Sequence, residues 1–97
     1  MTKTEQLFDE AVKLIHARGM HYGHPAIQMD RIAQLWSAYL NFPVTSNQVP
    51  MLMALLKISR SVESPELQDN YTDALAYIAI SKTCHEYMQD KDFEWEH

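Results

Sequence analysis

The chain has 97 residues, of which 46% are hydrophobic and 10% aromatic, and its formal net charge is -5. This length is that of one small domain, and the apolar content excludes a disordered chain. The negative charge argues against nucleic acid as the main partner, because binding to the phosphate backbone requires cations.

The first two predicted helices cover residues 3–18 and 25–40. Apolar residues recur at helical spacing in the first, Thr2 or Thr4 can cap its start, and Gly19 is expected to end it. The second begins at Pro25, which suits a first helical turn, and either Gly23 or His24 is expected at its cap. The large side chains of its expected apolar face are Ile27, Ile32, Leu35, Trp36, Tyr39 and Leu40.

The third predicted helix ends near Val62, and two starts are open. Thr45 with Gln48 is typical of a capping box, whereas a start at Asn47 places Pro50 in the tolerated first turn. This helix is apolar nearly all round, which predicts a central position in the fold.

After the next break, Ser64 and Pro65 open either a short helical turn or the last helix itself, which is expected to end near Met88. Four helices with short connections predict an all-α, four-helix-bundle-like fold. We expect a single helical domain over 1–90, followed by an acidic aromatic tail over 91–97.

The apolar content exceeds what one small core holds and favours a homo-oligomer, either a dimer or a tetramer. A single cysteine, Cys84, is typical of the reducing cytoplasm. Because no apolar stretch approaches the roughly 20 residues of a membrane span, we expect no membrane partner.

Four charged side chains stand inside the last two apolar segments. Lys57 and Arg60 share one helix face, and Asp69 and Asp73 share another. Antiparallel packing of the two helices lets these faces meet. One interpretation is a structural salt-bridge cluster, because a buried carboxylate must be paired. The other is a ligand site in which Lys57 and Arg60 bind phosphate and Asp73 orients Arg60.

Aromatic residues and histidines extend the ligand interpretation. Tyr22, His24 and Trp36 are expected near the charged cluster, where an aromatic ring can stack on a nucleobase. The chain contains no HxxxH or HExxH motif, so zinc is not expected. No cofactor is predicted, although Asp69 and Asp73 are able to supply ligands to Mg²⁺.

Three segments together resemble an uncharacterised family of small helical proteins common in phages and prophages. These segments are YGHPAIQMDRIAQLWSAYL (22–40), QVPMLMALLKISR (48–60) and DNYTDALAYIAI (69–80). The last is also similar to phage nucleotide-modification-associated proteins and, more distantly, to all-α NTP pyrophosphatases of the MazG and dUTPase type. Those enzymes hold Mg²⁺ with an ExxE and an ExxD motif and form dimers or tetramers.

The resemblance implies a MazG-like oligomeric fold with altered site chemistry. By position, Lys57 and Arg60 replace the ExxE carboxylates, and Asn70 and Asp73 fall on the ExxD, so only Asp73 matches. Losing three of four carboxylates removes most of the charge that holds Mg²⁺. The change converts a metal site into an anion site.

We therefore expect a non-catalytic, phage-type protein that binds a nucleotide or nucleotide-like signal. Its role would be in nucleotide metabolism or in sequestering a defence signal in the cytoplasm of a bacterial host. One alternative is a divergent Mg²⁺-dependent nucleotide pyrophosphohydrolase that uses Asp69, Asp73 and Asp30. Another is an inhibitor that binds a host protein through an exposed helix face or the acidic tail.

Overall fold

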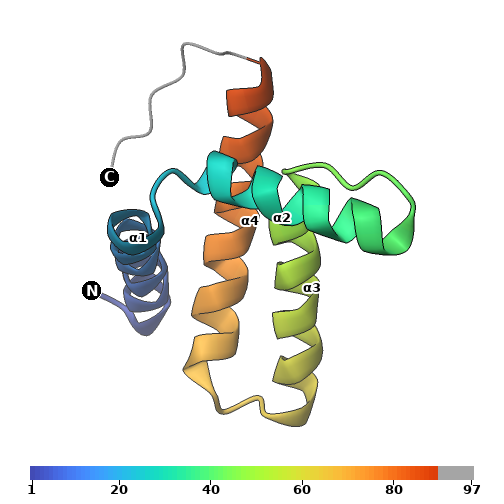
Figure 1. Ribbon diagram of the computed structural model, residues 1–97. Coiled ribbons are helices and arrows are strands. Elements are labelled where there is room, and N and C mark those ends of the chain that lie inside the picture. Colours follow the sequence, from blue (N-terminus) through green and yellow to red (C-terminus); the bar gives the residue numbers. More distant parts are fainter. Residues whose placement is uncertain (90–97) are drawn as a thin grey trace.

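The computed structural model describes residues 1–89, and the predicted tail over 91–97 lies outside the described residues. Four helices follow one another: α1 (Lys3–Tyr22), α2 (Pro25–Leu40), α3 (Gln48–Glu63) and α4 (Gln68–Gln89). No strand occurs in the described part of the chain (Figure 1). The all-α class is confirmed, and the arrangement is compatible with a helical bundle.

The first helix begins as predicted but ends later. The side chain of Thr2 accepts a hydrogen bond from the backbone N–H of Glu5, whose carboxylate accepts one from the backbone N–H of Thr2. This second bond lowers the pKa of Glu5. The predicted end at Gly19 is wrong, because Gly19 is buried within α1 and the helix continues to Tyr22. Gly23 ends it with a φ of 80°, which glycine adopts without steric cost.

The connections confirm the cap at His24 and the start of α3 at Asn47. The Nδ1 atom of His24 accepts a hydrogen bond of 3.1 Å from the backbone N–H two residues on, and so caps α2. Asn47 stands at the start of α3, with Pro50 in its first turn. One hydrogen bond of the alternative capping box at Thr45 is also present, since the backbone N–H of Thr45 donates to the side chain of Gln48.

The central helix is α4, with α3 along one side and α1 along the other, while α2 lies across α3 and α4 (Figure 1). The prediction that the third helix is central is therefore wrong. The reason is the size of the side chains. Small buried residues of α4, including Ala74, Ala76 and Ser81, let the other helices approach it closely.

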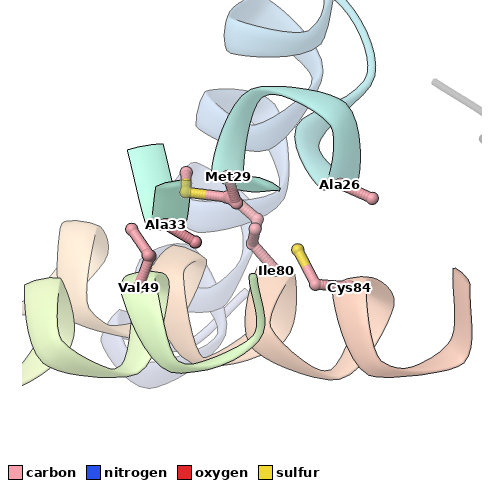
Figure 2. Close-up of a cluster of buried hydrophobic side chains, with 6 residues drawn as sticks. All are labelled: Ala26, Met29, Ala33, Val49, Ile80 and Cys84. Carbon is pink, nitrogen blue, oxygen red and sulfur yellow. The ribbon is translucent and has the colours of Figure 1, made fainter. Parts of the chain in front are cut away.

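The main cluster of buried apolar residues lies where α2 crosses the other two helices (Figure 2). Its members are Ala26, Met29 and Ala33 of α2, Val49 of α3, and Ile80 and Cys84 of α4. The contact surface of α2 thus consists partly of alanines, which suit a close crossing. Ile32 and Trp36 pack against this cluster as partly buried residues. The other large side chains of the predicted apolar face are exposed, namely Ile27, Leu35, Tyr39 and Leu40.

None of the described helices is both long and apolar enough to cross a membrane.

The core assignment predicts a large difference between two isoleucines of α4. Ile80 is 4% exposed and Ile78 is 44% exposed. We expect Ile80→Ala to lower the free energy of unfolding by about 3 kcal/mol, because it leaves a cavity, and Ile78→Ala to lower it by less than about 1 kcal/mol. Urea denaturation followed by circular dichroism measures both. If Ile80→Ala does not fold, Ile80→Val should still cost about 1 kcal/mol, and equal costs at both positions would contradict this packing.

Candidate functional site

The carboxylate of Asp73 joins three helices. Its Oδ2 atom lies 2.9 Å from the Nζ of Lys57 on α3, and its Oδ1 atom lies 3.4 Å from the Nη2 of Arg18 on α1. The side chains of Asp73 and Lys57 are only 13% and 17% exposed, so water screens this pair weakly. The pairing answers why an aspartate stands in a buried helix face: two cations neutralise it.

Arg18 is the site residue that the sequence interpretation missed. Its guanidinium carbon lies 5.0 Å from the centre of the Tyr77 ring, a cation–π arrangement that holds the side chain against α4. The sequence carries a signal for it, since Arg18 continues the apolar stripe of Ala11, Leu14 and Ile15 at helical spacing. A cation in an apolar stripe needs an anionic partner, but nothing local shows that this partner is 55 positions away.

A cleft of about 240 Å³ lies beside Arg18, between α1, α4 and the start of α2. Its lining residues are Ile15, Arg18, Gly19, Tyr22, Gly23, Pro25, Gln28, Met29, Tyr77 and Ile80. The Nη1 atom of Arg18 is buried and has no hydrogen-bond partner among the described residues. The cleft therefore combines a cation that retains an unused donor, two tyrosine rings and one side-chain amide.

The aromatic residues predicted for the site are placed in different regions. Tyr22 lines the cleft. His24 caps α2, and its ring centre lies 4.8 Å from that of Tyr87. Trp36 lines a separate apolar recess with Tyr39 and Leu40.

The remaining charged candidates make no ion pair with Asp73 in the described part of the chain. Arg60 and Asp69 are exposed, and the structure records no ion pair for either within residues 1–89. Asp30 accepts a hydrogen bond of 2.8 Å from the side chain of Gln34 on the same helix. In the described part of the chain, no group of three or more His, Cys, Asp or Glu residues is arranged to hold a metal ion.

Cys84 belongs to the core and is fully buried beside α2. Burial raises the pKa of its thiol to about 11, because the thiolate would lose its hydration. A nucleophilic cysteine needs the opposite environment, one that is accessible and electropositive. The position of Cys84 is that of a structural side chain.

A sequence model of the family described as a domain of unknown function (DUF6378) matches residues 6–85. The chain is similar to the Gene 55 protein of Mycobacterium phage D29, with 32% identity over 96% of this chain and 63% of that protein. It is also similar to the Gene 55 protein of Mycobacterium phage L5, with 36% identity over 65% of this chain and 41% of that protein. The chain thus spans less than two thirds of the length of these curated relatives. No solved structure matches it.

The ion-pair geometry predicts unequal roles for the two aspartates of the DxxxD segment. We expect Asp73→Ala to lower the free energy of unfolding by about 3 kcal/mol, because it leaves Lys57 buried without its partner. Asp69→Ala, at an exposed position in the first turn of α4, should cost about 1 kcal/mol or less. Urea denaturation of both variants tests this, and a cost for Asp73→Ala no larger than that for Asp69→Ala would refute it.

The environment of Cys84 predicts a thiol that does not react in the folded protein. With a pKa of about 11, only about one thiol in a thousand is ionised at pH 8, and the sulfur is out of contact with solvent. We expect an aromatic disulfide reagent to modify Cys84 slowly in buffer and rapidly in denaturing urea, as absorbance measures. Rapid modification of the native protein would show that this core opens readily.

Proposed function

The chain belongs to the family described as a domain of unknown function (DUF6378), and from this starting point we propose that it is a phage-type protein that binds a nucleotide or nucleotide-like signal without catalysis. The similarity to two mycobacteriophage proteins supports the phage-type part of the proposal. The role proposed is in nucleotide metabolism or in sequestering a host defence signal, in the host cytoplasm.

The observation that carries the ligand proposal is the unused donor of Arg18. A buried N–H without an acceptor costs about 1–3 kcal/mol, and such groups are rare in native proteins. Arg18 lines the cleft, but its Nη1 atom is out of contact with solvent, so the guanidinium must turn toward the cleft before an anionic ligand supplies the missing acceptor. A phosphate oxygen meets this need well, because charge-assisted bonds to arginine are among the stronger hydrogen bonds.

The charges around the cleft favour an anionic ligand, although the net charge of the whole chain is negative. Lys57, Arg18 and Asp73 together carry a net charge of +1. Because the single charge of Asp73 is shared between two cations, one unit of positive charge is left to act on a ligand. The site proposed here thus keeps Lys57 and Asp73 from the sequence interpretation but assigns the contact with phosphate to Arg18 in place of Arg60.

The other lining residues suit a nucleoside. Tyr22 is 64% exposed and its ring can stack on a base, while the amide of Gln28 can both donate and accept a hydrogen bond. The cleft is slightly smaller than the roughly 300–1,000 Å³ of typical ligand pockets. Its size therefore favours a ligand no larger than a mononucleotide, or one such part of a larger ligand.

Hydrolysis is not part of the proposal. The alternative pyrophosphohydrolase requires Asp73 to hold Mg²⁺ together with Asp69 and Asp30, but Lys57 and Arg18 contact both oxygens of Asp73. A MazG-like, oligomeric arrangement remains part of the proposal. The all-helical fold and the exposed apolar surface support it. No contact in the described residues favours the host-protein inhibitor over the nucleotide ligand.

The proposal predicts stabilisation by nucleotides that depends on Arg18. We expect nucleoside mono-, di- or triphosphates, or a cyclic dinucleotide, to raise the melting temperature without Mg²⁺, since a ligand that binds only the native state stabilises it. Arg18→Ala should weaken that binding about tenfold or more, because the ligand loses a charged donor. Isothermal titration measures the affinities.

Two further variants make the ligand test specific. Arg31→Ala removes an exposed arginine of α2 outside the cleft and should bind like the unmodified chain. Tyr22→Ala changes an exposed ring, so it should fold normally, yet lose about 1–3 kcal/mol of nucleotide affinity while binding inorganic phosphate unchanged. Absence of any shift, or equal affinity of Arg18→Ala and Arg31→Ala, would overturn the proposal. A shift seen only with Mg²⁺ would instead favour the hydrolase alternative.

A further inference from the structure

The outer side of α3 exposes a row of large apolar side chains. We call the row the α3 apolar face; its members are Met51 (42% exposed), Leu52 (45%), Leu55 (55%), Leu56 (43%) and Val62 (77%). Residues spaced three, four and seven apart share one side of a helix, so these residues lie on one side of α3, with Ser59 between Leu55 and Val62. The opposite side of α3, with Val49, Ala54 and Lys57, faces the rest of the molecule.

The composition of the core makes this exposure significant. Six of the ten buried hydrophobic residues in the described part are alanine. The larger leucines of α3 are instead left in water. Monomeric proteins rarely expose a continuous apolar surface of this kind, and those that do use it for an interaction.

The charges of α3 lie inside the molecule or toward the last turn of the helix, where the exposed Arg60 follows Leu56 by one turn at the edge of the face. Lys57 turns inward to Asp73 and so is removed from the outer surface. Glu63 is the last residue of α3, and Gln48 is the first. Near Gln48 the face continues into a recess of about 240 Å³ lined by Phe42, Pro43, Val44, Gln48, Met51 and Leu52.

We propose that the α3 apolar face binds a second copy of this chain, with the two α3 helices antiparallel about a two-fold axis between Leu55 and Leu56. A two-fold contact uses the same surface on both copies, so the surface must be self-complementary. In this register Leu52 lies opposite Ser59 of the second copy, a large side chain against a small one. Gln48 lies opposite Glu63 of the second copy, an amide donor against a carboxylate.

The sequence of α3 favours this pairing over the parallel one. Parallel helices would place Glu63 against Glu63 and Ser59 against Ser59, which adds charge repulsion and leaves a gap. The occupant is a second copy because the face pairs with itself in size at Leu52 and Ser59 and in polarity at Gln48 and Glu63. The dimer contact specifies the oligomeric part of the proposed function and uses none of the ligand-site residues, since Lys57 turns inward to Asp73 and no residue of the α3 apolar face lines the Arg18 cleft.

The first test is the mass of the full chain in solution. We expect sedimentation equilibrium to give a dimer for the unmodified chain and a monomer for Leu55→Glu, because a buried carboxylate without a partner opposes association. The matched control is Val12→Glu, which introduces the same charge at a residue of α1 that is 50% exposed. This variant should leave the dimer intact. A monomeric unmodified chain, a dimeric Leu55→Glu chain or a monomeric Val12→Glu chain would each refute the inference.

The second test is the direction of the two helices. Leu55→Cys lies beside the two-fold axis and should form an intermolecular disulfide with a mild oxidant. Ser59→Cys should not, because in the antiparallel pair the two copies of residue 59 are about 10 Å apart along the helices, beyond disulfide reach. The buried Cys84 does not compete. Cross-linking at both positions, or at neither, would overturn the antiparallel register.

These results separate the dimer from the ligand site. A monomeric Leu55→Glu chain should still be stabilised by nucleotide, and Arg18→Ala should still be a dimer. If the unmodified chain is a monomer but still binds nucleotide, the α3 interface is refuted and the ligand proposal is retained.

Discussion

A carboxylate inside a small helical protein must be neutralised, and in this chain that requirement connects three of the four helices. Asp73 on the central α4 pairs with Lys57 from α3 and Arg18 from α1. Because an unpaired buried charge costs several kcal/mol, the two pairings restrain α1 and α3 relative to α4. The same arrangement leaves one donor of Arg18 unused at the cleft, so a structural ion pair and a candidate ligand site share one residue.

The size of the side chains determines the rest of the architecture. Alanines and other small residues occupy the helix contacts, as at Ala26 and Ala33 of α2 and Ala76 of α4. Close helix contacts of this kind leave little interior volume for leucine, so large apolar residues such as Leu35 and Leu55 lie on the outside. An alanine-rich core and an exposed leucine face are therefore two consequences of one packing arrangement, and both agree with association between copies.

Much of the fold could be predicted because helix ends depend on local chemistry. The caps at Thr2 and His24 follow from short-range hydrogen bonds that the residue types specify, and the start of α3 at Asn47 follows from the tolerance of a first helical turn for Pro50. The end at Gly19 could not be predicted in the same way, since glycine is also tolerated inside a helix that packs closely on another. The central position of α4 was missed because apolar content indicates burial in any setting, including an interface between chains.

The sequence by itself determined the helical class, most helix boundaries and the need for Asp73 to have a cationic partner, because each depends on residue type and short spacing. Only the tertiary structure decided which cations those partners are. Lys57 and Arg60 are equivalent candidates in the sequence, yet packing turns Lys57 inward and leaves Arg60 in solvent. It also brings Arg18 to Asp73 across 55 positions and places Tyr22 and Tyr77 at one cleft. Such contacts depend on how whole helices cross, and no local pattern encodes that geometry.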